Sequence, residues 1–257
     1  MITLLSPAKK LDLESPCDQF TPSRPRHMAE TAELAETLRD KGPGEIKRLM
    51  KLSDALAELN YTRFQDWTKR HTRHNSRPAA LTFNGEVYTG LDAATMTEED
   101  MAFAQDHLRI LSGLYGVLRP LDRIQPYRLE MGTRLETGRG GSLYAFWGDE
   151  LARTLRRDLG RNGVVVDLAS KEYTKAVPTD VLDARIIEPK FLDRTSSGSY
   201  RTIMVFAKRA RGTMARFIID RRLDDPGPLK DFDGMGYAYD PDRSEGDTWV
   251  FTRDQSS

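Results

Sequence analysis

Cysteine and long apolar runs are nearly absent from this chain of 257 residues. Cys17 is the only cysteine, so no disulfide can form within the chain, and this usage fits a reducing compartment such as the cytoplasm. No segment approaches the roughly 20 apolar residues of a membrane span, and residues 1–5 show no signal-peptide pattern. We therefore expect a cytoplasmic protein with no membrane association.

Metal ligands and redox groups are also scarce. Of the four histidines, His71 and His74 could share a helix face, but His27 and His107 are remote in sequence, so no ligand set with a recognisable spacing exists. Cys17 has neither a neighbouring cation nor a resolving partner that would make it reactive. The chain also lacks the Gly-x-x-x-x-Gly-Lys phosphate loop and the Gly-x-Ser-x-Gly nucleophile elbow. No metal and no cofactor are expected.

The chain has no net charge, because 39 Lys and Arg residues balance 39 Asp and Glu residues. A polyanionic partner could therefore be recognised only through the distribution of charge. Basic residues gather in residues 41–51, 63–77, 119–139 and 208–222. Such runs are compatible with DNA binding, but also with solvated helix faces.

The composition is that of a globular protein, with 39% apolar and 30% charged residues. Short apolar runs predict strands at residues 2–5, 79–83, 164–168, 186–187, 202–206 and 249–251, and a hairpin turn at residues 195–199. Helical patterns cover residues 28–38, 98–111 and 149–159, two segments that begin at Pro43 and Ser53, and the stretch from Ala207. We predict an α/β fold in which residues 1–257 form a single compact mixed-sheet domain with surrounding helices.

The middle of the chain has glycine, proline and arginine where a packed core would need apolar residues. Gly113 and Gly116 follow one helical pattern and precede a shorter one, so the segment predicts a helix-hairpin-helix-like element whose hairpin amides could face a phosphate. Arg119 and Arg128 would supply cations beside it. A glycine-capped helix end followed by a proline-rich turn is the alternative.

Several long motifs give the chain a resemblance to a known family. They include LSPAKKLD near the N-terminus, SGLYGVLRPLD and PYRLEMGTRLE in the middle, and DLASKEYTKAV and AKRARGTMARFII later in the chain. The sequence resembles the YaaA proteins, bacterial proteins of the peroxide stress response. The resemblance implies a mixed α/β fold with few relatives, duplex DNA binding through a helix-hairpin-helix element, and an association with lowered free intracellular iron. The common pattern of that element is Gly-x-Gly, whereas two residues separate Gly113 from Gly116.

Two loops that follow predicted strands carry lysines. Lys9 lies after the first strand, where open α/β sheets place ligands, and it could bind a phosphate or pair with Asp12 or Glu130. Lys171 and Lys175 share one face of the helix that follows the most apolar strand, and the start of this helix could hold an anion. Local ion pairing on a solvated helix is the alternative.

Arg128 lies in residues 126–132, which we interpret as a rigid loop that presents Arg128 and Glu130. Its planar guanidinium fits a phosphate or a carboxylate in a two-point contact. A pair with Glu130 or with Asp122 would instead make Arg128 a structural residue.

The helix from Ala207 carries Lys208 and Arg211 along one flank of its apolar face, and this flank could line a groove. Gly212 within the same helix costs about 1 kcal/mol relative to alanine, which predicts that another backbone or a ligand approaches closely there. A kink without a function is the alternative.

Two function hypotheses follow. The leading one, as the family resemblance implies, is a monomeric protein of the peroxide stress response that binds duplex DNA with weak sequence specificity, mainly through phosphates. The rival is an enzyme that acts on a small phosphorylated or carboxylated molecule in the same cleft, with Lys9, Arg128, Glu130 and Lys171 as anion clamp and acid or base. The residues assigned to this basic cleft are Lys9, Ser112, Gly113, Gly116, Arg119, Arg128, Lys171, Lys175, Lys208 and Arg211.

Overall fold

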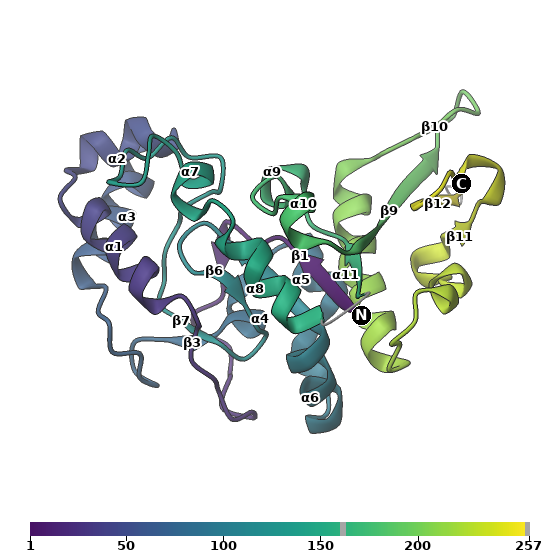
Figure 1. Ribbon diagram of the computed structural model, residues 1–257, viewed down its shortest axis with the longest axis horizontal. Coiled ribbons are helices and arrows are strands. Elements are labelled where there is room, and N and C mark those ends of the chain that lie inside the picture. The colour runs from purple at the N-terminus through teal and green to yellow at the C-terminus, as the bar shows by residue number, and fades with distance from the viewer. Residues whose placement is uncertain (160–162, 255–257) are drawn as a thin grey trace.

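An eight-stranded mixed sheet organises the computed structural model, which describes residues 1–159 and 163–254 (Figure 1). The strand order is β11-β12-β9-β8-β1-β5-β6, and β10 pairs with β9 beside this path. The strands are β1 (Ile2–Leu5), β5 (Leu108–Ser112), β6 (Gly116–Leu118), β8 (Val164–Asp167), β9 (Arg185–Arg194), β10 (Tyr200–Arg201), β11 (Ala238–Tyr239) and β12 (Thr248–Arg253). Short ladders also pair β2 (Lys10–Leu11) with β4 (Phe83–Asn84) and β3 (Arg77–Pro78) with β7 (Arg123–Ile124).

The centre of the sheet is parallel. β1 lies between β5 and β8, and Leu4 is opposite Arg109 on one side and Asp167 on the other. All four residues of β1 are buried, which is typical of a parallel strand covered on both faces. The two apolar runs that predicted β1 and β8 are therefore confirmed as the core of the sheet.

Helices surround the sheet. α1, α2, α3 and α7 gather at one end of the molecule, and β11 and β12 lie at the opposite end (Figure 1). One contiguous hydrophobic core joins residues from Ile2 to Phe251, so the described residues form a single compact domain. None of their helices is long and apolar enough to cross a membrane. The helices are α1 (Met28–Arg39), α2 (Pro43–Met50), α3 (Asp54–Asp66), α4 (Ala79–Thr82), α5 (Glu86–Leu91), α6 (Glu98–His107), α7 (Leu143–Trp147), α8 (Glu150–Leu159), α9 (Lys171–Thr174), α10 (Thr179–Leu182) and α11 (Met204–Asp220), with short 3-10 turns η1 (Ala93–Thr95), η2 (Gly227–Asp231), η3 (Gly234–Gly236) and η4 (Pro241–Arg243).

Helices α5 and α11 pack so closely that their backbones touch. Gly212 of α11 lies against the Val87 carbonyl of α5, and Gly90 of α5 lies against the Arg209 carbonyl of α11. A Cβ at either glycine would overlap the facing backbone. The close approach predicted at Gly212 is confirmed, and a backbone makes it.

The segment around Gly113 forms a β-hairpin, so the prediction of a helix-hairpin-helix element was wrong. α6 ends at His107, and β5 pairs with β6 in antiparallel fashion, with Ser112 opposite Gly116. Every residue of β5 is buried. Pairing with β1 satisfies the backbone of this buried strand, which outweighs the helical spacing of its leucines. Gly116, at a φ of 69°, makes the turn that brings β6 back.

Two other predicted strands are largely helical. Residues 79–83 form α4 followed by the first residue of β4, and the amides of Ala79 and Ala80 donate to loop carbonyls outside the main sheet. In residues 202–206, α11 already begins at Met204. Met204 and Val205 are exposed, so no buried face favoured a strand there. The turn predicted at residues 195–199 does connect β9 to β10.

Candidate functional site

The carboxyl ends of β1 and β8 form the topological switch point of the sheet. The chain leaves β1 for β5 on one side and leaves β8 for β9 on the other, and open α/β sheets bind ligands at such a point. The Ser170 amide after β8 donates a hydrogen bond to Ser6 Oγ after β1 at 2.8 Å. The Tyr88 hydroxyl donates to the Ser6 carbonyl oxygen at 2.9 Å. The two strand-end loops are therefore held in direct contact.

Lys9 and Arg128 meet at the carboxylate of Glu130. Lys9 Nζ lies 2.7 Å from Glu130 Oε2, and Arg128 Nη2 lies 3.2 Å from Glu130 Oε1. Both cations therefore have Glu130 as an ion-pair partner, which was one of the alternatives for each, and anion binding by either of them stays a prediction. Only 17% of the Arg128 side chain is exposed, and its Nε is buried with no hydrogen-bond partner among the described residues. Two cations share one carboxylate, which leaves excess positive charge beside the loop that follows β1.

Residues of the β-hairpin pack against the loop that carries Arg128 and Glu130. The Leu129 carbonyl oxygen packs against Gly113 so closely that a Cβ would overlap it. The hydroxyl groups of Ser112 and Tyr127 are hydrogen-bonded at 2.6 Å. Ser112 and Gly113 thus support the arginine-bearing loop, whereas Gly116 packs against Trp147 and His27. All three residues are buried, which argues against their direct contact with a phosphate.

Arg119 is paired inside the protein as well. Its Nη2 lies 3.1 Å from Asp122 Oδ1, and its backbone amide donates to Asp122 Oδ2 at 2.8 Å. The Ser23 hydroxyl donates to the same carboxylate at 2.6 Å. Asp122 is fully buried, so Arg119 neutralises a carboxylate that would otherwise be buried with its charge unmatched.

The remaining assigned cations lie on α9 and α11. Lys171 begins α9 and Lys175 follows it, and both line a pocket that also contains Asp167. Arg211 is near enough to Asp167 for their charges to interact, although burial lowers the pKa of Arg211. Lys208 is exposed on α11. The ten assigned residues thus fall in three places: the buried hairpin, the ion pairs in the neighbouring loops, and the region of α9 and α11.

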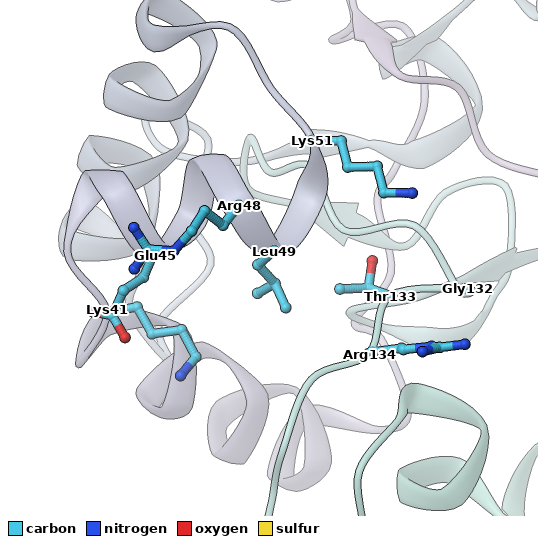
Figure 2. Close-up of a pocket in the computed structure, with 8 residues that line it drawn as sticks. All are labelled: Lys41, Glu45, Arg48, Leu49, Lys51, Gly132, Thr133 and Arg134. Carbon is cyan, nitrogen blue, oxygen red and sulfur yellow. The ribbon is translucent and has the colours of Figure 1, made fainter.

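A groove with four cations among its eight lining residues lies elsewhere, between α2 and residues 132–134 (Figure 2). It has a volume of about 660 Å³. Glu45 is the one acidic side chain of the lining, and it accepts a hydrogen bond from the Gly42 amide at 2.9 Å. Within the described part of the chain, no cation of this lining forms an ion pair. The lining residues are Lys41, Glu45, Arg48, Leu49, Lys51, Gly132, Thr133 and Arg134.

Local folding places these cations at the groove. Ile46 and Met50 are buried four residues apart, so α2 turns that face to the core and leaves Arg48 exposed. Lys51 ends α2 with a φ of 52°, a left-handed conformation that glycine usually occupies. Arg134 is exposed between two buried neighbours. The basic runs at residues 41–51 and 119–139 were visible in the sequence, but their meeting across a groove was not.

A family model described as peroxide stress protein YaaA matches residues 1–243. The chain belongs to this family. A UPF0246 protein of Marinomonas sp. (strain MWYL1) is 51% identical over 254 residues, which is 99% of this chain and 97% of the relative. UPF0246 proteins of Aromatoleum aromaticum and Ralstonia nicotianae are 51% and 52% identical over 259 and 255 residues, in each case 98% of this chain and 99% of the relative. The resemblance inferred from the sequence motifs is confirmed.

This YaaA-family chain has a second basic pocket, with a volume of about 410 Å³, beside the loop that follows α3. Burial lowers the pKa of His71 to about 4, so this side chain is neutral at pH 7. Its Nε2 lies 3.0 Å from the Tyr115 hydroxyl. Residues of the basic run at 63–77 therefore also line a pocket. The residues that line it are Ser23, Arg24, Lys69, Arg70, His71 and Arg123.

Proposed function

We propose that this YaaA-family protein binds the phosphate backbone of duplex DNA in the groove between α2 and residues 132–134. The supporting observation is the set of four cations in the groove, which form no ion pair among the described residues although the chain as a whole is neutral. Each cation that meets a phosphate releases condensed counterions, which favours binding at low salt. A cation already held by Glu130 or Asp122 would first have to leave its partner.

Contacts to phosphates position a protein on DNA without reading the bases, so the proposed binding has weak sequence specificity. It would place a peroxide stress protein directly on the molecule that needs protection. The effect on free iron that the family resemblance implies would then be indirect. The described residues offer no group of three His, Cys, Asp or Glu side chains that could hold a metal ion.

Fluorescence anisotropy with a labelled duplex of mixed sequence, titrated at several salt concentrations, tests the proposal. Four phosphate contacts predict that log K falls with log salt with a slope of about −3.6. Arg48→Ala and Arg134→Ala should each weaken binding and make the slope shallower by about 1.

Lys190→Ala is the matched control, because Lys190 is exposed on β9, away from α2 (Figure 1). This variant should bind DNA like the wild type. Absence of binding at low salt would refute DNA binding, and unchanged slopes for both arginine variants would refute the groove as its site.

A second candidate function is binding or conversion of a small phosphorylated or carboxylated molecule at Lys9, Arg128 and Glu130. The buried Nε of Arg128, which has no hydrogen-bond partner in the part of the chain that the structure describes, favours it, since an oxyanion there would satisfy a buried donor. Isothermal titration calorimetry with inorganic phosphate tests this candidate. Binding that Lys9→Ala removes, without a change in the salt slope for DNA, would support it, and no heat of binding with the wild type would exclude it.

A further inference from the structure

A separate pocket lies between the sheet and the helices α9 and α10. Its volume is about 390 Å³, within the range of small-molecule sites. Leu4, Val165 and Ile186 contribute an aliphatic floor from β1, β8 and β9, and Val177 and Leu182 add apolar side chains from the helical side. This floor suits a small aliphatic group.

Two carboxyl groups stand at one end of this floor. Val165 is opposite Ile186 in the parallel ladder, so Asp167 and Glu188, two residues further along, lie on the same face of neighbouring strands. Asp167 Oδ1 accepts a hydrogen bond from the Ala169 amide at 3.0 Å. The other oxygen of Asp167 and the carboxylate of Glu188 have no partner among residues 1–159 and 163–254.

Two lysine residues belong to the lining of the same pocket. Lys171 and Lys175 are both exposed, and neither forms an ion pair within the described residues. The Lys175 ammonium lies 5.0 Å from the centre of the Tyr144 ring, a cation–π contact that keeps this end of the side chain in place. The pocket thus carries charges of both signs, and these form no ion pair with one another among the described residues, although the charge of Lys171 acts on Asp167.

A bound cation would favour the charged form of the Asp167 carboxyl, which burial disfavours. Burial raises the pKa of Asp167 to about 7 and the charge of Glu188 adds to the effect, although the Ala169 amide and the cations Arg211 and Lys171 act in the opposite direction. A ligand ammonium placed between the two carboxyl groups would relieve their repulsion and provide the hydrogen-bond donors that they lack. Water can do this only in part, because Asp167 is mostly buried.

We propose that this pocket binds a small zwitterion, an α-amino acid with an aliphatic side chain. Its ammonium lies between Asp167 and Glu188, its carboxylate faces Lys171 and Lys175, and its side chain covers the aliphatic floor. The pocket shares no lining residue with the groove proposed for DNA, so this inference does not depend on the proposed function.

A thermal-shift screen of the full-length protein against the standard L-amino acids, one at a time, is the first test. Aliphatic members such as L-leucine should raise the melting temperature most, because binding only to the folded state stabilises it. Calorimetry then compares L-leucine with 3-methylbutylamine, which lacks the carboxylate, and with 4-methylpentanoate, which lacks the ammonium. Each half-ligand should bind at least about tenfold more weakly, a loss of about 1.4 kcal/mol.

Variants identify which end of the ligand each charge holds. Asp167→Asn and Glu188→Gln should weaken L-leucine binding at least about tenfold and leave 4-methylpentanoate unaffected, whereas Lys175→Ala should weaken L-leucine and leave 3-methylbutylamine unaffected. Asp180→Asn is the control, because Asp180 is an exposed carboxylate of α10 outside the lining. It should bind L-leucine like the wild type.

Three results would overturn the inference: no amino acid stabilises the wild type, the half-ligands bind as tightly as L-leucine, or the folded pocket variants bind L-leucine like the wild type. Arg134→Ala separates the two proposals. It should lose DNA affinity and keep full L-leucine affinity, so failure of either binding activity can be assigned to its own site.

Discussion

Replacement of Asp167 by asparagine should stabilise the protein at neutral pH, by an amount that depends on pH. Burial, followed by the charge of Glu188, raises the pKa of Asp167 to about 7, although the Ala169 amide and the cations of Arg211 and Lys171 act in the opposite direction. The unfolded chain ionises the same carboxyl near its ordinary pKa of 3.8. The folded protein therefore retains a proton over a range of pH in which the unfolded chain has lost it.

This difference sets the sign and the size of the effect. From about pH 4 to about pH 7, the wild type becomes less stable as pH rises, because the folded state binds more protons at this site, and above pH 7 the loss levels off. Each pKa unit corresponds to about 1.4 kcal/mol, so the cost at Asp167 is about 1.5 kcal/mol at pH 5 and about 4 kcal/mol at pH 8. Asparagine carries no charge and can still accept from the Ala169 amide.

Urea unfolding of both proteins from pH 5 to pH 8 measures the difference. The gain in free energy of unfolding that Asp167→Asn gives should be about 2.5 kcal/mol larger at pH 8 than at pH 5. Asp180→Asn, an exposed control, should show no such dependence, and Glu188→Gln should move the levelling-off to lower pH by removing a repulsive charge. A gain for Asp167→Asn that stays constant across this range would show that Asp167 ionises normally and would refute the reasoning.

Further substitutions test the packing and the basic groove. Gly212→Ala should lower the free energy of unfolding in urea by about 3 kcal/mol, because its Cβ would overlap the Val87 carbonyl; a loss below about 1 kcal/mol would mean that the helices can move apart. Lys51→Gly should raise the melting temperature, because glycine adopts the left-handed backbone conformation of this position without strain. The same change should reduce the salt slope of DNA binding by about 1. A lower melting temperature would show that Lys51 is not strained there. Arg128→Ala should cost about 1–3 kcal/mol of stability, since Lys9 still holds the shared carboxylate, and a shallower salt slope in this variant would place Arg128 in the DNA interface.

Much of the sheet and several helices could be predicted from local sequence alone. The runs at residues 2–5 and 164–168 are mostly apolar, with Thr3 and Asp167 as their polar members, and such runs are typical of strands that are buried on both faces. The helix predicted at residues 28–38 is confirmed, and its signal is the spacing of its apolar residues. The helix start predicted at Pro43 is also confirmed, and its signal is the proline itself. Both signals are local properties of the sequence.

The failures occur where distant contacts decide. Leu108 to Leu111 continue the spacing of α6, and no local feature separates a fourth helical turn from a buried strand. The strand forms because β1 supplies a parallel partner from the start of the chain. The basic groove was missed for the same reason, since residues 132–134 meet α2 only after the intervening elements have folded.

The basic regions of this molecule are of two kinds, one with ion-paired cations and one with unpaired cations. Ion pairing distinguishes the two kinds better than the clustering of basic residues in the sequence does. Arg119 and Arg128 belong to the segment with the most glycine and arginine, yet each is held by a carboxylate of its own loop, and Gly113 allows the loop of Arg128 to pack closely. Arg48 and Arg134 occur in less unusual sequence, but among the described residues their charges are unmatched. A paired cation must give up an existing partner before it can bind a ligand, whereas an unmatched one gives up only water. The groove and the zwitterion pocket therefore take precedence over the glycine-rich segment as places to look for ligands.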